Sequence, residues 1–264
     1  MGSLLQVIAL GIVQGLAEFL PISSSGHIVI ASALLEQFGD ESLPKIGLTT
    51  NVALHVGTLV SILVVFRREL IQSLSDPPLL RAVVVATIPL ALIYPLKDTL
   101  ESAFESPLVA GCGLLVTAVL LLAAERMGTG EGSSRVSLAQ AAIIGVFQLI
   151  APCPGISRSG STIAGALFAG VERRTAATFS FIIAIPAIAG GAAASLVDVI
   201  QEPEQPDWGL LLIGAIVSCL VGIAALRLML NIVGKRRLWI FSIYCSVVGL
   251  STIVWQLQYA LTSN

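Results

Sequence analysis

A cluster of polar residues interrupts an apolar stretch near the start of the chain, between Gly11 and His27. It contains a carboxylate, Glu18, followed by a proline, three consecutive serines, a glycine and a histidine. Ionisable groups inside a membrane segment are costly and are usually functional. A carboxylate to hold a metal ion or a proton, a serine to attack and a histidine to transfer the proton are parts that phosphoryl transfer needs.

A second cluster lies 134 residues further along and aligns with the first without gaps. The aligned identities are Gly11 with Gly145, Gln14 with Gln148, Ile22 with Ile156, Ser23 with Ser157, Ser25 with Ser159 and Gly26 with Gly160. Glu18 aligns with Pro152, and Ser24 aligns with Arg158, so one copy carries the acid and the other carries the fixed cation. We interpret this pattern as an internal repeat, with halves at about 1–134 and 135–264.

Both clusters lead into apolar helices, whose first N–H groups are unsatisfied and carry partial positive charge. Two helix N-termini, an arginine and several hydroxyl groups that converge describe an anion site, and phosphate fits it best. The candidate phosphate contacts are Arg158, Ser23, Ser25, Ser157, Ser159, Gly160, Ser161 and Thr162. Serines at a helix start are often simple N-caps, and this alternative stays open for Ser23, Ser25 and Ser161.

Two other polar side chains lie within apolar segments. Gln14 is four residues before Glu18, so the two share a helix face, and they are the candidate metal ligands. His55 lies in an apolar segment with Asn51 four residues before it, and we interpret it as a packing or cavity-lining residue.

The composition is that of an integral membrane protein. Hydrophobic residues make up 56% of the chain and charged residues 11%, and the mean hydropathy is +0.94. No basic stripe suggests nucleic acid as a partner, and no cysteine spacing suggests a zinc site or a disulfide framework. Long apolar runs predict six transmembrane helices, at 49–66, 79–96, 107–124, 175–199, 208–230 and 238–260.

The two polar clusters each break a pair of shorter helices. The first pair is expected at 4–20 and 27–38, and the second lies within 138–170 and is broken at 152–160. We expect each pair to enter the membrane and return as a re-entrant hairpin, because irregular backbone at this depth must be surrounded by protein or water. The predicted fold is therefore all-α, with six transmembrane helices and two re-entrant hairpins in one membrane domain, residues 1–264.

Three spans per half is an odd number, so the two halves must lie in the membrane with opposite orientations. With the N-terminus outside, the predicted cytoplasmic segments carry Arg67, Arg68, Arg81, Arg126, Arg135, Arg173, Arg174, Arg227, Lys235, Arg236 and Arg237, against only Lys45 and Lys97 outside. This bias obeys the positive-inside rule. Both termini are predicted to be extracytoplasmic, and the two hairpins enter from opposite faces and meet near the midplane.

The segments EFLPISSSGH and PGISRSGSTIAGAL resemble the BacA/UppP family of undecaprenyl-diphosphate phosphatases, and the likeness covers essentially the whole chain. The resemblance implies a plasma-membrane enzyme that hydrolyses undecaprenyl diphosphate to undecaprenyl phosphate and inorganic phosphate, recycling the lipid carrier of cell-wall synthesis. It also implies bacitracin resistance on overproduction, dependence on a divalent cation such as Mg²⁺ or Ca²⁺, and an active site that opens to the extracytoplasmic side.

By motif position, the resemblance implies that Glu18 is the essential glutamate, Ser24 the nucleophile, His27 the proton-transfer histidine and Arg158 the phosphate-binding arginine. Gln14 stands where some members have glutamate, which removes one metal ligand. Direct attack by water is the alternative mechanism. A transporter or flippase of a phosphorylated isoprenoid lipid is the alternative function, because inverted repeats with broken helices are typical of transporters. A homodimer is one candidate oligomeric state.

Overall fold

The computed structural model describes residues 2–37, 48–73, 75–93, 103, 106–128, 132–201 and 206–262. These residues form helices joined by turns, with an isolated bridge between Ser133 and Val171. The helices are α1 (Gly2–Ala17), α2 (Ser24–Gln37), α3 (Leu48–Val65), α4 (Arg67–Ser73), α5 (Pro77–Ala91), α7 (Pro107–Met127), α8 (Leu138–Leu149), α9 (Arg158–Phe168), α10 (Arg173–Gln201), α11 (Trp208–Gly234) and α12 (Trp239–Thr262).

Within these ranges, four helices are long and apolar enough to cross a membrane. They are Pro107–Met127, Arg173–Ser195, Trp208–Gly234 and Trp239–Leu261. Five shorter helices are also apolar. Large apolar side chains such as Leu212, Leu220 and Val247 face outward, where a soluble protein would place polar ones. The chain is therefore an all-helical, multi-pass membrane protein.

Several helix starts follow from local capping. Ser106 accepts the backbone N–H of Val109 and precedes Pro107, which occupies the first helical turn of α7 as predicted. Ser137 and Gln140 form a reciprocal capping box at the start of α8. Pro186 lies inside α10, as expected from the sequence. Residues 94–96 of the predicted span at 79–96 lie outside the described residues.

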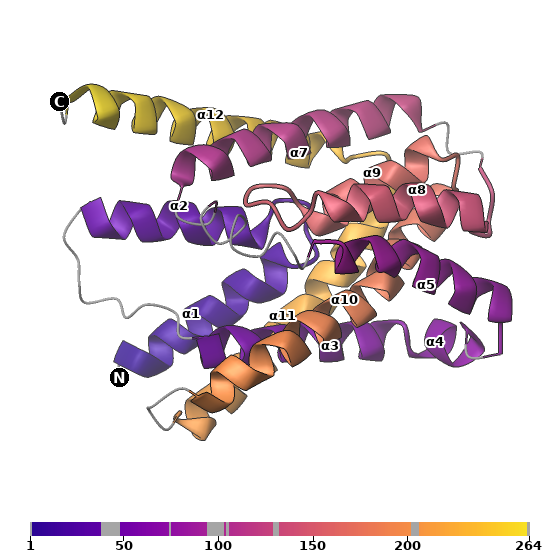
Figure 1. Ribbon diagram of the computed structural model, residues 1–264, viewed down its shortest axis with the longest axis horizontal. Coiled ribbons are helices and arrows are strands. Elements are labelled where there is room, and N and C mark those ends of the chain that lie inside the picture. The colour runs from indigo at the N-terminus through magenta and orange to yellow at the C-terminus, as the bar shows by residue number, and fades with distance from the viewer. Residues whose placement is uncertain are drawn as a thin grey trace.

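Helices from the two halves of the sequence are interleaved (Figure 1). The helix α1 packs against α11, and α8 packs against α5, so the first helix of each broken pair lies on a helix from the other half. The helices α7 and α12 run side by side, and α3 crosses α10. Both chain termini lie toward the left of the view, and α4 lies at the opposite end.

The middle of the molecule is filled by α9 and the segments around it. Every residue of α9 from Ser159 to Leu167 is buried. The ring of Phe181 packs edge-on against Phe19 and stacks against Phe66, with centroid distances of 5.8 and 5.9 Å. This packing encloses the ends of both broken pairs, which is where the two polar clusters lie.

In both polar clusters the second helix begins earlier than the sequence analysis predicted. The second helix of the first pair was expected from His27, but α2 begins at Ser24. The break in the second pair was expected to last until Gly160, but α9 begins at Arg158. The reason is side-chain capping, since a serine oxygen that accepts the N–H of the third helical residue lets the helix start immediately after that serine. The first helix, expected to reach residue 20, ends at Ala17.

Candidate functional site

The first polar loop joins α1 to α2 and begins with Glu18. The carboxylate Oε2 of Glu18 accepts a hydrogen bond from Gln14 Nε2 at 3.1 Å, which confirms that the two share a helix face. Ser23 ends the loop with a positive φ of 64° and accepts the backbone N–H of Gly26 at Oγ. The cap makes Ser24 the first residue of α2, so its side chain stands at the positive end of that helix.

The second polar loop ends in the same way. Ser157 Oγ accepts the backbone N–H of Gly160 at 3.1 Å, and this cap makes Arg158 the first residue of α9. The loop is tied to α7 by Thr117, whose hydroxyl donates to Gly155 O at 2.8 Å and accepts from Ser157 N at 3.0 Å. Ser24 and Arg158 are paired when the sequences of the two clusters are aligned, and each is the first residue of its helix.

The two loops are in direct contact through glycines. A Cβ atom on Gly26 would lie 2.7 Å from Gly155 Cα, which no side chain could tolerate. Gly155 has a φ of +85°, and a Cβ there would lie 2.0 Å from Ala110 O. Both the left-handed backbone and the close approach require glycine at this position. The loops thus meet at the centre of the molecule with the spacing fixed by backbone contact.

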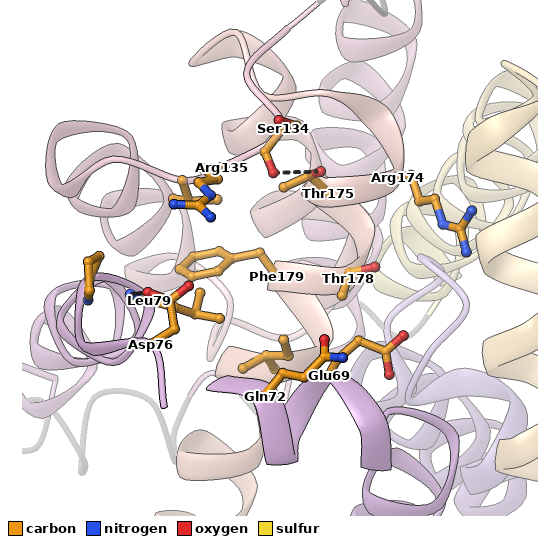
Figure 2. Close-up of a pocket in the computed structure, with 13 residues that line it drawn as sticks. Glu69, Gln72, Asp76, Leu79, Ser134, Arg135, Arg174, Thr175, Thr178 and Phe179 are labelled. Carbon is orange, nitrogen blue, oxygen red and sulfur yellow. Dashed lines mark hydrogen bonds between the residues drawn. The ribbon is translucent and has the colours of Figure 1, made fainter. Parts of the chain in front are cut away.

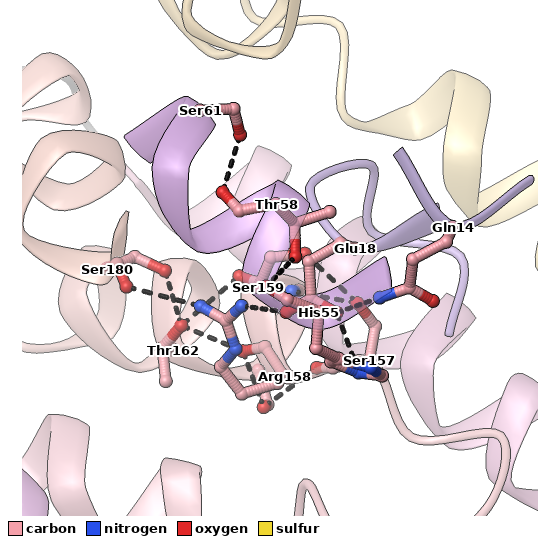
Figure 3. A network of polar contacts seen from close by, with 12 residues as sticks. Gln14, Glu18, His55, Thr58, Ser61, Ser157, Arg158, Ser159, Thr162 and Ser180 are labelled. Carbon is pink, nitrogen blue, oxygen red and sulfur yellow. Dashed lines mark hydrogen bonds and ion pairs between the residues drawn. The ribbon is translucent and has the colours of Figure 1, made fainter. Parts of the chain in front are cut away.

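Glu18 and Arg158 form an ion pair between the loops (Figure 3). Glu18 Oε1 lies 2.5 Å from Arg158 Nη2, and the two side chains are 9% and 16% exposed. The other amino group of Arg158, Nη1, donates to Ser180 O at 3.5 Å. The structure therefore brings together the acid and the cation that the sequence placed 140 residues apart.

A cavity of about 80 Å³ lies beside this ion pair. Its lining residues are Ala17, Glu18, Ser23, Ser24, Ser25, Ala151, Ile156, Ser157 and Arg158. Ser23 Oγ and Ser25 Oγ are 3.3 Å apart and share one hydrogen bond, in which either hydroxyl can be the donor. The Ser24 hydroxyl has no hydrogen-bond partner among the residues that the structure describes, so it is the serine available to a ligand in this cavity.

The remaining hydroxyl groups of the second cluster have partners within the protein. Ser159 Oγ lies 3.2 Å from Ser157 Oγ, and Ser161 Oγ donates to Ser157 O at 2.9 Å. Thr162 Oγ1 donates to Ser159 O at 3.3 Å. These three residues and Gly160 do not line the cavity. A phosphate contact from any of them stays a prediction.

His27 also lies away from the cavity lining. Its Nδ1 is 2.8 Å from Ser23 O, and its Nε2 is 2.8 Å from the Tyr244 hydroxyl. Because a carbonyl only accepts, Nδ1 carries a proton, and in the neutral ring Nε2 accepts from Tyr244. The rings of His27 and Tyr244 are stacked at 5.6 Å. No described bond joins His27 to Ser24, so its role in proton transfer stays a prediction.

His55 lines a cavity, which the sequence analysis gave as one of its two expected roles, and it also lies close to Glu18. It lies on α3 with Nδ1 2.9 Å from Asn51 O and Nε2 3.6 Å from Glu18 Oε2. It lines a larger cavity of about 430 Å³, which shares Glu18, Ala151 and Arg158 with the small one. The signal available in the sequence was the spacing of Asn51 and His55, which places two polar groups on one face of an apolar helix.

Another cavity, of about 360 Å³, lies between α4, the start of α5 and the start of α10 (Figure 2). Arg135 and Arg174 approach it from different sides of Phe179, and Glu69 and Asp76 lie across from them. None of the residues predicted from the two polar clusters lines this cavity. The candidate site is therefore the pair of cavities that share Glu18, Ala151 and Arg158 as lining residues, and we call these two the connected cavities because of the shared residues.

The residues at the ion pair could supply only a minority of the ligands that a divalent cation needs. Mg²⁺ and Ca²⁺ take six or more oxygen ligands. Glu18 is the one carboxylate among the described residues that line the two connected cavities, and amide groups of Gln14 and Asn51 lie nearby. No group of three His, Cys, Asp or Glu side chains gathers in the described part of the chain. This donor set suits a cation that arrives with an oxygen-rich ligand.

Comparison with known proteins gives consistent matches along the chain. Residues 7–251 match the family described as bacitracin resistance protein BacA. The chain is similar to an undecaprenyl-diphosphatase of Rhodopirellula baltica, with 39% identity over 98% of this chain and 100% of the relative. It is 37% identical to an undecaprenyl-diphosphatase of Desulfatibacillum aliphaticivorans, over 95% and 98% of the two chains. A third undecaprenyl-diphosphatase, of Christiangramia forsetii, is 39% identical over 94% and 96%.

The matched range includes both polar loops, the ion pair and every residue that lines the connected cavities. The chain belongs to the BacA family of bacitracin resistance proteins.

Proposed function

We infer that this protein is an undecaprenyl-diphosphatase, a membrane hydrolase that converts undecaprenyl diphosphate to undecaprenyl phosphate and inorganic phosphate. The product is the lipid carrier used in cell-wall synthesis, and its renewal opposes bacitracin. The observation that carries this inference is the small cavity, where a serine hydroxyl without a protein partner and an arginine stand at two helix N-termini. A terminal phosphate that enters it meets a nucleophile, a fixed cation and two positive helix ends.

In the proposed mechanism, Ser24 Oγ attacks the terminal phosphorus. The new bond is Oγ–P, and the bond that breaks joins this phosphorus to the bridging oxygen, whose electron pair leaves with undecaprenyl phosphate. Arg158 neutralises charge on the equatorial oxygens. Glu18 holds Arg158 in place through their ion pair. Water then hydrolyses the phosphoserine and releases inorganic phosphate. Direct attack by water on the substrate is the competing route.

His27 is the proposed acceptor of the Ser24 proton. It lies one helical turn after Ser24 at the start of α2. Its bonds to Ser23 O and Tyr244 hold the ring in a defined orientation, so the transfer requires a bridging water or rotation of the ring.

Glu18, assisted by Gln14, would supply the protein's ligands to Mg²⁺ or Ca²⁺. The diphosphate and water would supply the remaining oxygens. Such a cation neutralises phosphate charge.

We further propose six transmembrane spans and two re-entrant hairpins as an inverted repeat, with both termini and the site opening extracytoplasmic. Three observations support this topology. The packing of α1 on α11 is matched by that of α8 on α5. Both termini lie away from α4, which carries Arg67 and Arg68. The larger cavity extends from the ion pair to Asn51 near the start of α3 and Ser195 near the end of α10.

The test is phosphate release from undecaprenyl diphosphate by purified protein in detergent, with and without Mg²⁺ or Ca²⁺. We expect cation-dependent release that Ser24→Ala loses and that Ser32→Ala, an exposed serine on the same helix, retains. Substantial phosphate release by Ser24→Ala would still show an enzyme, but one in which water is the nucleophile. If folded wild-type protein released no phosphate, the function would be wrong and lipid transport would become the better reading.

A further inference from the structure

The two connected cavities divide the candidate site into unequal compartments. The smaller, about 80 Å³, contains the serines of the first loop, and the larger, about 430 Å³, contains His55 and Asn51. Glu18 and Arg158 line both and therefore stand at the junction. A diphosphate whose terminal phosphate lies beside Ser24 must place its inner phosphate at or beyond this junction, within the larger cavity.

His55 is placed to contact that inner phosphate. Its Nδ1 is fixed by Asn51 O one turn back in α3, which orients the ring and directs Nε2 toward Glu18 and the cavity. Nε2 has no hydrogen bond among the described residues, and at 3.6 Å it stands beyond direct hydrogen-bond distance of Glu18 Oε2. Figure 3 shows His55 and Arg158 converging on Glu18 from different helices.

The rest of the larger cavity offers few other polar groups. Apart from the junction pair, its polar lining side chains are Asn51, His55 and Ser195, and the remainder are proline, glycine or apolar. A phosphate group in this compartment near the junction would therefore find its donors in Arg158, in the Asn51 amide and in His55. Because His55 Nδ1 already donates to Asn51 O, Nε2 donates to the phosphate when the ring carries a proton on both nitrogens.

We propose that His55 binds the inner phosphate of the diphosphate substrate and makes the site selective for a diphosphate over a monophosphate. This inference rests on the proposed function. A lipid monophosphate can occupy the smaller cavity, beside Ser24, or the larger cavity, beside His55, but it cannot reach both. It therefore loses the contacts that one of the two cavities offers. The product is then held less tightly than the substrate.

The experiment compares two non-hydrolysable probes. Methylenediphosphonate carries two linked phosphoryl groups, and methylphosphonate carries one. Their binding to full-length protein in detergent with Mg²⁺ is measured by calorimetry, independently of turnover. We expect wild type to prefer the diphosphonate. His55→Ala should weaken diphosphonate binding by a factor on the order of 10 to 100, the value of a hydrogen bond to a charged group, and leave methylphosphonate unchanged.

Two further variants decide between a contact and a structural effect. His55→Gln retains an N–H donor and should recover part of the preference. Thr87→Val removes a side chain that bonds its own helix at Val83 O, outside the cavities, and should bind both probes as wild type does. Thermal unfolding in detergent confirms that each variant is folded.

The proposal is overturned if His55→Ala keeps the diphosphonate preference, if it weakens both probes equally, or if wild type shows no preference. Failure of the proposed function has a different signature, because wild type would then release no phosphate from undecaprenyl diphosphate.

Discussion

Two buried glutamate–arginine pairs lie in the described part of the chain, and they are used differently. Glu125 and Arg173 are 3.2 Å apart with side chains 11% and 6% exposed, so they are buried about as deeply as Glu18 and Arg158. Arg173 also donates to the carbonyls of Glu125 and Gly128, each at 3.1 Å. Glu125 Oε2 accepts the backbone N–H of Leu238 at 2.6 Å. This pair binds the end of α7 to the starts of α10 and α12.

Burial alone therefore does not identify a functional charge. The described partners of Arg173 are protein groups that fix helix ends, and neither member lines any of the three cavities. Glu18 and Arg158 instead line two cavities and leave room for a ligand. The informative feature is whether each charged group also faces a cavity or is surrounded by protein groups alone. The first pair should therefore matter for stability and the second for turnover.

The largest difference is expected between alanine substitutions of the two arginines. Arg158→Ala should reduce phosphate release by at least about 10²–10³-fold, the range for losing a donor to developing oxyanion charge. Arg173→Ala should lower the free energy of unfolding by about 3–5 kcal/mol, because it leaves Glu125 buried without its partner, and should preserve turnover per folded molecule. Phosphate-release assays and thermal unfolding in detergent measure both. Near-wild-type turnover in Arg158→Ala would remove the distinction between the pairs.

The two glutamates provide the matching test. Glu18→Gln keeps the side-chain shape but loses the charge that orients Arg158, and turnover should fall by about 100-fold or more. Glu125→Gln still accepts the Leu238 N–H, so it should lose only about 1.5–3 kcal/mol of stability and remain active. The same two assays apply. If both variants lost turnover equally, both ion pairs would affect turnover only by stabilising the fold.

A glycine with positive φ lies three residues before each arginine. Substituting alanine for each glycine should affect the two arginines differently. Gly155→Ala combines left-handed strain, about 1–2 kcal/mol, with a clash against Ala110 O, about 1–3 kcal/mol, and should displace Arg158 and lower turnover. Gly170 has a φ of +74° but nothing within 4 Å of a Cβ, so Gly170→Ala should cost only the backbone strain. Unfolding temperatures that do not differ between the two would contradict the close contact of the loops.

The smallest effect is expected beside Glu18. Gln14→Glu adds a second carboxylate to the candidate site, and should lower the Mg²⁺ concentration that gives half-maximal turnover by roughly tenfold. Gln72→Glu adds the same charge to the cavity between α4 and α10 and should leave that concentration unchanged. A cation titration of the release rate measures both. An unchanged requirement in Gln14→Glu would argue against a cation at Glu18.

The sequence was sufficient for the parts of the site that the two polar clusters and their charges encode. The broken helices, the shared face of Gln14 and Glu18 and the meeting of Glu18 with Arg158 were all predictable, because ionisable residues in apolar segments need partners. The helix starts at Ser24 and Arg158 were placed too late, because an N-cap serine and a loop serine look the same in sequence.

The contacts of the histidines were not predictable. His55 meets Glu18 only because α3 packs beside α1, and His27 meets Tyr244 only because α12 passes α2. The structural role of Arg173 was also hidden, since its partner Glu125 lies 48 residues away in what the sequence presented as a polar loop boundary. Such pairings depend on tertiary packing, which periodicity and local spacing do not encode.

The narrowness of the cavity beside Ser24 has a consequence for an enzyme surrounded by lipid. Phospholipids with two ester links on the phosphorus vastly outnumber any isoprenoid carrier in a bilayer, and they carry the same charged oxygens. The cavity beside Ser24 is about 80 Å³, against about 430 Å³ for its neighbour, so a phosphoryl group with one ester link fits it more readily than one with two. This narrowness favours the isoprenoid carrier over the phospholipids that surround the enzyme.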